Sequence, residues 1–420
     1  MATSQSPHTD PLISIEICAG AGGQAVGLHR AGFEHLALLE LDPHAVTTLG
    51  ANIHRWPGWN KRRANELEPM DVREFLDSEL FKKLALEPYR LDLLAGGVPC
   101  PPFSLAGKQL GEDDERDLFP DMLKIVDRLR PKAVMIENVR GILEPPQVFI
   151  DYRRRIVGEL GDMGYVVPEV NRGWSPQRQD MEMRSVWRRL DARDFGVPQL
   201  RPRAILVAIH KDFLGDNRFV WPKRIIGDSV SVADVLHDSM RERYSAFWET
   251  NGDGEKPKPG ESTGEEAFNR WWDMAQKAES GPNEGVAPTL VGGSKKHGGA
   301  DLGPTRAKRA WKDMGVDATG VANDAEDCHA PRDLFRKNGP MLTVGQAALI
   351  QGFPPEWDFK GGKTARYRQV GNAFPPPVAE AVGRAIAAVL RPERRAALSK
   401  RYVLDEGDCS MPETGEPPLF

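Results

Sequence analysis

Residues 93–104 read LLAGGVPCPPFS, and the rest of the chain can be interpreted outward from them. The apolar run from Leu91 to Ala95 is interrupted only by Asp92 and predicts a buried strand that two glycines and a proline end abruptly. Cys100 follows between prolines, which restrict the backbone and orient its side chain. Because open α/β sheets bind ligands at the carboxyl ends of strands, its thiol is a candidate nucleophile. A small buried cysteine used only for packing is the alternative.

The start of the chain has the pattern of a nucleotide-binding βα unit. Residues 13–17 alternate as a strand does, residues 18–23 read CAGAGG, and residues 24–31 predict a helix. The glycines would let the backbone approach a ligand closely. Taken alone, the motif is equally typical of a tight turn made for packing.

A second predicted strand, residues 33–39, ends in an acidic residue. Glu40 follows the glycines by about 20 residues, the spacing of an acid that binds ribose hydroxyls. Its alternative role is to cap the next helix, but Asp42 directly precedes Pro43 and is the better cap. Asp71 and Val72 are expected at the end of a third strand.

A charged side chain also follows the predicted strand at residues 133–136: Glu137 comes directly after it. If this strand lies beside the one before Cys100, a carboxyl group and a thiol could face one substrate. Capping of the next helix is the alternative role of Glu137.

The next segments predict two strands, at residues 165–167 and 204–209. Arg201 and Arg203 precede the second of these, and alternate positions of an extended chain point the same way. Residues 104–117 predict a long polar loop that could act as a lid.

Composition limits the possible classes of protein. The chain has 420 residues, 40% of them hydrophobic, and a mean hydropathy of −0.47, which is typical of a globular protein with two domains. It has no apolar run long enough to span a membrane and no signal-peptide core. None of the four cysteines forms a C-x-x-C pair, which argues against structural zinc and disulfides and favours a reducing cytoplasm.

The net charge of −5 conceals two basic blocks. Residues 171–211 hold nine Lys and Arg against four Asp and Glu, and residues 291–312 hold six against one. Such blocks can follow phosphates, although a solvated face is the usual explanation of a charge run. Residues 402–420 hold five acids and no base.

The character of the chain changes from Lys211 onward. Residues 249–266 predict a linker, residues 288–291 a short strand, and the region to about Phe335 a second, irregular domain. Residues 342–352 predict a helix, and a long apolar helix to Leu390 follows residues 369–376. The last thirty residues are expected to be mobile.

These motifs, in this order, resemble those of the bacterial DNA (cytosine-5) methyltransferase family. The resemblance runs from about Ile13 to Leu390 and is strong because the motifs occur as an ordered set. The family's successive motifs match residues 18–23 (CAGAGG), Glu40, Asp71, 99–104 (PCPPFS), 137–139 (ENV), 199–203 (QLRPR), 351–354 (QGFP) and 371–373 (GNA).

The resemblance implies an α/β fold: a Rossmann-like, S-adenosylmethionine-dependent methyltransferase fold with a smaller, irregular target-recognition domain. The final helix would return to pack beside the first motif. The implied parts are a flexible N-terminus (1–12), a catalytic domain (13–210), a target-recognition domain (211–340), a returning C-terminal part (341–392) and a flexible acidic tail (393–420).

The resemblance also implies the site residues. Catalytic roles fall on Cys100, Glu137, Arg201 and Arg203. S-adenosylmethionine would be bound by Cys18, Ala19, Gly20, Gly22, Gly23, Glu40, Leu41, Asp71, Val72, Pro99, Asn372 and Ala373. The basic block would bind DNA through Lys295, Lys296, Arg306, Lys308, Arg309 and Lys312. No metal is required.

The implied reaction is methylation of carbon 5 of a flipped-out cytosine in a specific sequence of double-stranded DNA. The Cys100 thiolate would add to carbon 6, because an added thiolate makes carbon 5 enamine-like. Glu137 would hydrogen-bond ring nitrogen 3, and Arg203 would hold the exocyclic oxygen. We expect a cytoplasmic bacterial monomer, with a restriction endonuclease acting on the same site but not bound.

Three departures from the family pattern stand out. The family usually has Phe at position 18, beside the cofactor's adenine, where this chain has Cys18. Phe374 replaces a common valine, and residues 171–187 look like an insertion.

Rival interpretations are an inactive DNA-binding protein with this fold and a Rossmann-type enzyme acting on a small molecule or RNA.

Overall fold

The structure is a computed structural model that describes residues 11–99, 117–215, 217–292 and 300–405. Its centre is a six-stranded sheet in the order β2-β1-β3-β4-β6-β5. The first four strands of that order are parallel, and β6 and β5 are antiparallel to their neighbours. The strands are β1 (Leu12–Ile17), β2 (Phe33–Leu39), β3 (Leu93–Gly96), β4 (Ala133–Val139), β5 (Trp187–Asp191) and β6 (Pro202–Ile209).

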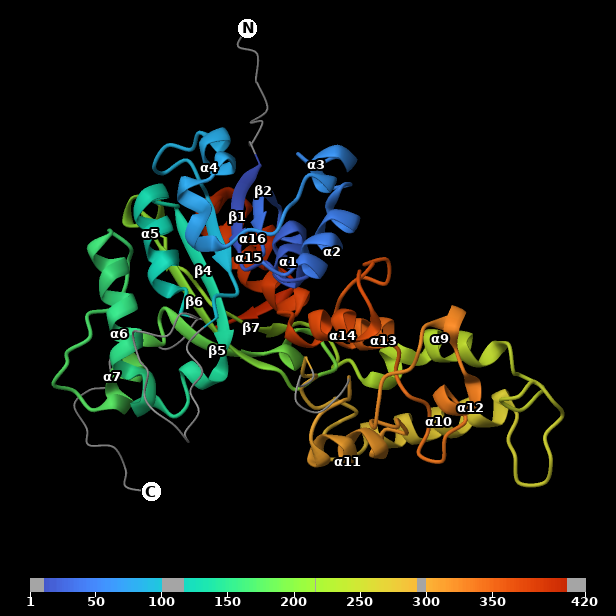
Figure 1. Cartoon of the computed structure of the whole chain (residues 1–420). Helices are drawn as coiled ribbons and strands as arrows, with labels where there is room; N and C mark the ends of the chain where they lie inside the picture. Colours follow the sequence, from blue (N-terminus) through green and yellow to red (C-terminus); the bar gives the residue numbers. More distant parts are fainter. Residues whose placement is uncertain (1–10, 100–116, 216, 293–299, 406–420) are drawn as a thin grey trace, which may run out of the picture.

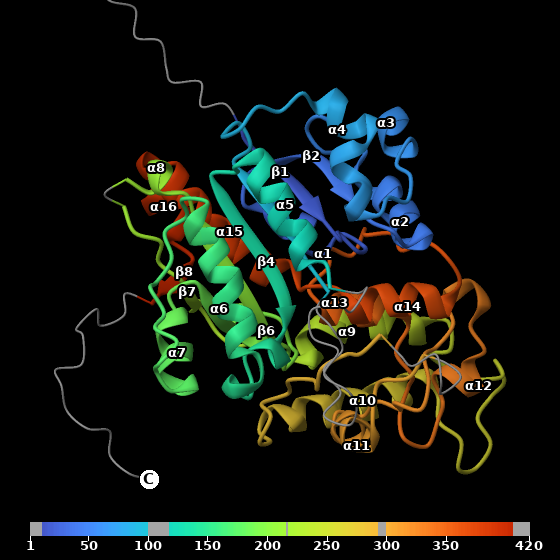
Figure 2. The ribbon, with the colours of Figure 1, turned by 60° about the vertical axis from the view of Figure 1, so that its left-hand side comes forward.

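Helices cover both faces of this sheet (Figures 1 and 2). On one face lie α5 (Phe119–Leu129) and α6 (Pro146–Asp162), whose apolar side chains share a core with Ile15 and Ile17 of β1. The other face packs against α1 (Gly23–Arg30) and α15 (Pro376–Leu390). The predicted return of the final helix is confirmed: α15 packs so closely on α1 that a Cβ at Gly27 would lie 2.3 Å from the carbonyl oxygen of Pro376.

Short helices after β2 build the edge of the sheet beside the Gly-rich turn. Asp42 caps α2 by accepting hydrogen bonds from the amides of His44 (2.8 Å) and Ala45 (3.0 Å), as the sequence predicted. The elements are α2 (Pro43–Ile53), α3 (Lys61–Asn65), the 3₁₀ helix η1 (Val72–Asp77) and α4 (Glu79–Leu84).

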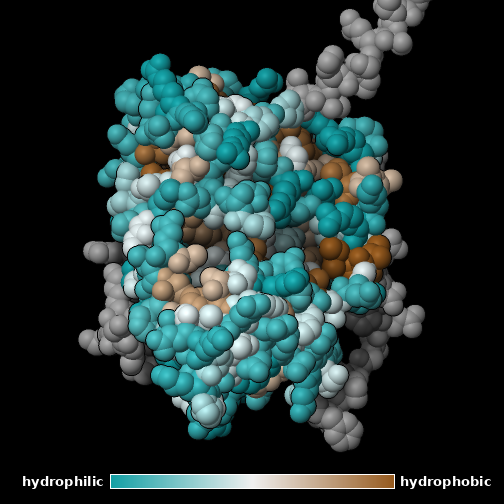
Figure 3. Space-filling model, turned by 90° about the vertical axis from the view of Figure 1, so that its right-hand side faces the viewer, coloured by the Kyte–Doolittle hydropathy of each residue, from teal (hydrophilic) through white to brown (hydrophobic). Residues whose placement is uncertain are grey.

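A second, mainly helical lobe lies beside the sheet (Figure 1). Its helices are α9 (Val232–Ser245), α10 (Gly264–Glu279), α11 (Thr305–Asp313), α12 (Ala330–Asp333), α13 (Val344–Ile350) and α14 (Lys363–Asn372). The fully buried Trp271, Trp311 and Tyr244 form part of its core, and its outer face is mostly hydrophilic (Figure 3). The expected irregular domain is therefore helical over much of its length, because α9 and α10 begin at capping boxes.

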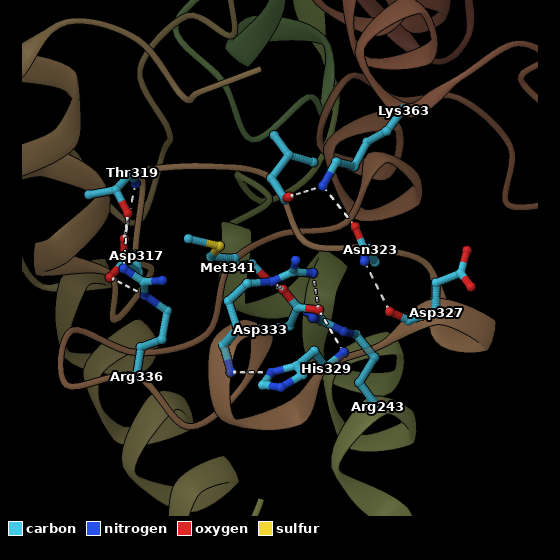
Figure 4. Close-up of polar contacts among 12 residues, drawn as sticks. Arg243, Asp317, Thr319, Asn323, Asp327, His329, Asp333, Arg336, Met341 and Lys363 are labelled. Atoms are coloured by element: carbon cyan, nitrogen blue, oxygen red, sulfur yellow. Dashed lines mark hydrogen bonds and ion pairs between the residues drawn. The ribbon is translucent and has the colours of Figure 1, made fainter. Parts of the chain in front are cut away.

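Apart from α12 and a short 3₁₀ turn at residues 325–327, residues 314–343 are the irregular part of this lobe, and polar side chains help to hold them (Figure 4). Arg336 pairs with Asp317 at 2.8 Å, and Asp317 in turn accepts hydrogen bonds from Thr319. Lys363 of α14 donates to the carbonyl of Val321 and to Asn323. These contacts replace the backbone ladder that a strand or helix would have supplied.

Several predicted elements are wrong. No strand ends at Asp71; its side chain caps η1 instead. Residues 165–167 make only an isolated bridge, between Tyr165 and His210, and β5 lies at Trp187–Asp191 instead. The predicted strand at 288–291 is absent, since the nearest pairing is a single bridge between Gln199 and Ala287. In each case a short apolar run lacks a partner along its whole length.

The expected boundary at 211 and the flexible tail from 393 are also wrong in part. β7 (Pro222–Ile225) pairs with β8 (Tyr402–Leu404), and α16 (Arg395–Ser399) precedes β8. Trp221 and Tyr402 are buried in the same core as α15, so both segments belong to the sheet lobe. The remaining elements are η2 (Arg140–Ile142), α7 (Pro176–Met183), η3 (Ala192–Phe195), α8 (Lys211–Leu214), η4 (Ala325–Asp327) and η5 (Pro392–Arg394).

The stretch at residues 171–187 packs onto the sheet lobe through α7. Arg153 of α6 is buried and pairs with Asp180 of α7 at 2.7 Å. Within the described ranges, no helix combines the length and apolar character needed to cross a membrane.

Candidate functional site

A cavity of about 460 Å³ opens where the carboxyl ends of β1 and β2 meet α14. Of the twelve residues that the resemblance implied for the cofactor, eleven line this cavity. They are Cys18, Ala19, Gly20, Gly23, Glu40, Leu41, Asp71, Val72, Pro99, Asn372 and Ala373. Glu137 lines it as well, so strand ends from across the sheet and a helix near the C-terminus meet at one place.

The Gly-rich turn takes the shape that its glycines allow. Gly20 and Gly22 have φ values of 54° and 89°, a left-handed conformation that favours glycine. Gly22 is the residue that does not line the cavity: it packs beneath Trp357, where a Cβ would lie 2.8 Å from the indole ring. At Gly23 a Cβ would lie 2.2 Å from the carbonyl oxygen of Phe374. The glycines of the motif thus also let the turn pack closely against Trp357 and Phe374 near the C-terminus.

Glu40 ties this turn to the end of β2. One carboxylate oxygen accepts a hydrogen bond from the amide of Gly20 at 2.7 Å, and the other accepts from the amides of Leu41 and Asp42 at 2.8 Å. Since a carboxylate has about four acceptor sites, it can still accept a hydrogen bond from a ligand. Asp42 does the capping, so Glu40 is not the helix cap.

Cys18 lies in the wall of the cavity and has a positive φ of 51°. Burial, reinforced by the charges of Glu40, Asp71 and Glu16, raises the pKa of its thiol to about 12. A thiol with this pKa stays protonated near neutral pH, so Cys18 is unsuited to nucleophilic chemistry.

Sequence reasoning missed five polar residues that line the same cavity: Glu16, Gln24, Arg73, Arg368 and Gln369. The carboxylate oxygens of Glu16 and both side-chain amide atoms of Gln24 are buried and have no hydrogen-bond partner within the described part of the chain. Burial, and then the nearby Glu40, raises the pKa of Glu16 well above its ordinary range. An acid inside an otherwise apolar strand was the available signal.

Glu137 lies within β4, which continues to Val139, so its alternative role as a helix cap is wrong. Its carboxylate pairs with the guanidinium of Arg203 at 2.7 Å, across the antiparallel pairing of β4 with β6. Burial raises the pKa of Glu137, while the charges of Arg203 and Arg201 oppose that rise. The group is therefore easier to protonate than an exposed glutamate.

Arg201 differs from its neighbour Arg203. Its buried guanidinium donates to the carbonyl oxygens of Leu290 (2.6 Å), Gly371 (2.7 Å) and Ala373 (2.8 Å), whereas Arg203 pairs with Glu137; neither arginine is among the residues that line the cavity. We propose a positioning role for Arg201 in place of the catalytic role that the resemblance implied, because its donors join its own segment to residues 290 and 371–373.

Cys100 lies outside the described residues, and so do residues 104–116 of the expected lid. Hydrogen bonds from side chains fix the backbone on either side of these residues. Asn138 donates to the carbonyl of Val98 at 2.8 Å, which fixes the approach to Pro99 beside Glu137. Asp117 accepts hydrogen bonds from the amide of Phe119 and the hydroxyl of Tyr152.

The predicted DNA-binding residues divide into three groups. Lys295 and Lys296 lie outside the described residues. Arg306, Arg309 and Lys312 are exposed on α11. Lys308 pairs with Asp301 at 2.8 Å, and this pair holds the start of α11 against the preceding loop. In the described part of the chain, no group of three or more His, Cys, Asp or Glu side chains could hold a metal ion.

Comparison with known proteins agrees with this geometry. The family model described as C-5 cytosine-specific DNA methylase matches residues 12–388. The chain is 44% identical to the Type II methyltransferase M.NaeI of Lentzea aerocolonigenes over 380 residues, which cover 90% of this chain and 75% of that protein. It is 40% identical to the Type II methyltransferase M.NgoMIV of Neisseria gonorrhoeae, covering 90% and 98%.

The fold also matches solved structures. The Entamoeba histolytica methyltransferase EhMeth superposes with a TM-score of 0.52 at 14% identity, covering 91% of this chain and 99% of that one. At that identity the likeness concerns the fold alone, which is the methyltransferase fold that the motifs implied. Because the family model matches nearly the whole of this chain, the chain belongs to the C-5 cytosine-specific DNA methylase family and is a DNA cytosine-5 methyltransferase.

Proposed function

We propose that this methyltransferase uses S-adenosylmethionine as methyl donor and acts on a cytosine rotated out of double-stranded DNA, through a covalent adduct with Cys100. The observation that carries the proposal is the single cavity that Glu40, Asn372, Pro99 and Glu137 share. Pro99 is the neighbour of Cys100, so a ligand in the cavity would lie next to the thiol.

The residues of the cavity fit the proposed donor. Acceptors for ribose hydroxyls stand at the end of β2, where Glu40 keeps a free acceptor site beside Asp71. The buried Glu16 carboxyl has no hydrogen-bond partner in the described ranges and suits the ammonium of the donor's methionine. When bound, S-adenosylmethionine supplies an electrophilic methyl group.

Glu137 and Arg203 would act on the cytosine. Because burial raises the pKa of Glu137, its carboxyl can carry a proton and donate a hydrogen bond to ring nitrogen 3. Arg203, which orients Glu137 at 2.7 Å, would hold the exocyclic oxygen and favour the Cys100 thiolate. Thiolate addition to carbon 6 would make carbon 5 nucleophilic. Once carbon 5 has taken the methyl group, loss of its proton would break the bond between carbon 6 and sulfur and release the thiolate.

The target base must leave the duplex, since the thiol and the carboxyl cannot reach it inside the stack. The exposed Arg306, Arg309 and Lys312 of α11 would bind phosphates of the duplex. The relatives M.NaeI and M.NgoMIV are Type II methyltransferases, and we propose the same restriction-modification role, with an endonuclease acting on the same site.

A filter assay with S-adenosylmethionine tritiated on the methyl group and mixed duplex DNA tests this proposal. Label should appear on cytosine, and DNA with 5-fluorocytosine at the target should trap a covalent complex that survives denaturation. Label on another base, on RNA only, or on no nucleic acid would contradict it.

A further inference from the structure

Two polar side chains on the floor of the cavity are buried without a partner. Glu16 is 0% exposed and Gln24 is 3% exposed, and none of their four side-chain oxygen and nitrogen atoms has a hydrogen-bond partner among the residues that the structure describes. Both residues line the cavity. Because buried polar groups in folded proteins are nearly always hydrogen-bonded, these atoms point to a ligand.

Glu16 and Gln24 lie on the same side of the sheet. In β1, Ser14 and Glu16 alternate with Ile15 and Ile17, which pack on the other face. Ser14 lies 3.0 Å from Nδ1 of His35, whose Nε2 donates to the carbonyl of Ala25 in α1 at 3.1 Å. The face that carries Glu16 is therefore the face that α1 covers, and Gln24 stands in the first turn of α1.

The position of Gln24 separates it from the adenosine end of the proposed cofactor. Glu40, one candidate for that end, directly follows β2, and Asp71, the other, directly precedes η1. Gln24 instead adjoins Gly23, which packs against Ala373 and the Phe374 carbonyl. An amino acid end would offer both a carboxylate, which only accepts hydrogen bonds, and an ammonium, which only donates them. A carboxamide matches this pair because it has both a donor and an acceptor.

We propose that the Gln24 carboxamide binds the α-amino-acid end of the methyl donor, with Nε2 donating to the carboxylate and Oε1 accepting from the ammonium. The assignment rests on the proposed S-adenosylmethionine cofactor. It makes Gln24 a binding residue that neither the Gly-rich motif nor the acid at the end of β2 identifies.

Calorimetry on the full chain tests the assignment with two ligands. S-adenosylhomocysteine has the amino acid end, and 5′-methylthioadenosine keeps the adenosine and thioether but lacks it. Gln24→Leu should weaken S-adenosylhomocysteine about 10- to 100-fold, the effect of losing hydrogen bonds to charged groups, and should leave 5′-methylthioadenosine within about twofold. Gln24→Glu should lose at least as much, because a carboxylate cannot donate to a carboxylate.

Glu40→Ala is the matched control, since it should weaken both ligands equally. The melting temperature of ligand-free Gln24→Leu should equal or exceed that of the wild type, because the variant removes an unpaired buried amide. A lower melting temperature with equal losses for both ligands, or no loss for either, would overturn the assignment. If the wild-type chain binds neither ligand, the proposed cofactor fails and the assignment fails with it.

Discussion

The sheet lobe and the helical lobe hold their functional residues in different ways. In the sheet lobe, strand pairing sets the positions of Glu16, Glu40 and Glu137, and their side chains converge because parallel strands end at one edge. In the helical lobe, residues 314–343 are held by side-chain pairs such as Arg336–Asp317.

We propose that this difference separates the chemistry, in the sheet lobe, from DNA recognition, in the helical lobe. A strand ladder is insensitive to which side chains point outward, so the reactive groups keep their geometry when surface residues change. Segments held by individual ion pairs can be rearranged by one or two substitutions. We therefore expect changes in the sheet lobe to affect methyl transfer on every DNA, and changes on α11 to affect DNA binding only.

The largest expected effect lies in the sheet lobe. Cys100→Ser should abolish methyl transfer, because a serine hydroxyl is barely ionised near neutral pH. S-adenosylhomocysteine should still bind with wild-type affinity by calorimetry, and no covalent complex should form with 5-fluorocytosine DNA. Turnover near the wild-type rate would disprove the covalent mechanism.

The next largest effect is expected at Arg201, which joins its own segment to residues 290 and 371–373. Arg201→Met should lower the free energy of unfolding by about 3 kcal/mol, because it removes the side-chain donors of the buried Leu290 and Gly371 carbonyl oxygens and leaves Ala373 with only its 3.3 Å contact from Gln351. Urea unfolding measures this. Arg203→Met is the comparison: if Arg203 acts on the base, methyl transfer should fall far more than stability does. Equal effects of the two variants on both quantities would remove the distinction.

At the end of β2, Glu40→Ala should weaken S-adenosylmethionine binding by about 1–3 kcal/mol, the contribution of charge-assisted hydrogen bonds. The loss has two sources, since Glu40 also accepts three backbone amides that shape the turn. Glu40→Gln, which keeps some acceptor capacity, should lose less. Unchanged calorimetric affinity in both variants would limit Glu40 to a structural role.

The pKa of Glu16 predicts how cofactor affinity depends on pH. Burial and Glu40 raise this pKa, so in the free protein the carboxyl binds a proton more readily than an ordinary glutamate. If its charged form binds an ammonium, S-adenosylmethionine should bind more tightly as pH rises, until Glu16 is ionised in the free protein. Glu16→Gln should flatten this profile, measured by calorimetry across pH; a Glu16→Gln profile as steep as the wild type's would contradict it.

The smallest effect is expected on α11. Replacing the exposed Arg306 and Arg309 with Ala should reduce the slope of log affinity against log salt by up to about two units, at about 0.9 per phosphate contact. If one of them reads a base, its loss should instead cost about 1–3 kcal/mol at one position of the site.

Lys308 sharpens this test because it pairs with Asp301. Lys308→Ala should change the salt slope less than Arg309→Ala does, while cofactor affinity stays unchanged in both. A salt slope and site preference unchanged in the Arg306 and Arg309 variant would show that α11 is only a solvated face.

The sequence alone determined the parts that local patterns encode. Alternating or apolar runs identified β1 to β4 and β6, and Asp42 beside Pro43 located the start of α2. The ordered motifs identified the family and grouped eleven residues that line one cavity. These predictions succeed because a strand, a helix cap and a Gly-rich turn each depend on a few neighbouring residues.

Only the tertiary structure decided which contacts are made by residues that look alike in the sequence. Arg201 and Arg203 are two positions apart in one extended segment, yet one holds backbone carbonyls and the other pairs with Glu137. The unpartnered state of Gln24 and the pairing of β7 with β8 depend on residues far away in the chain. No local pattern encodes such contacts, because the partner of a buried polar group is set by packing between distant segments.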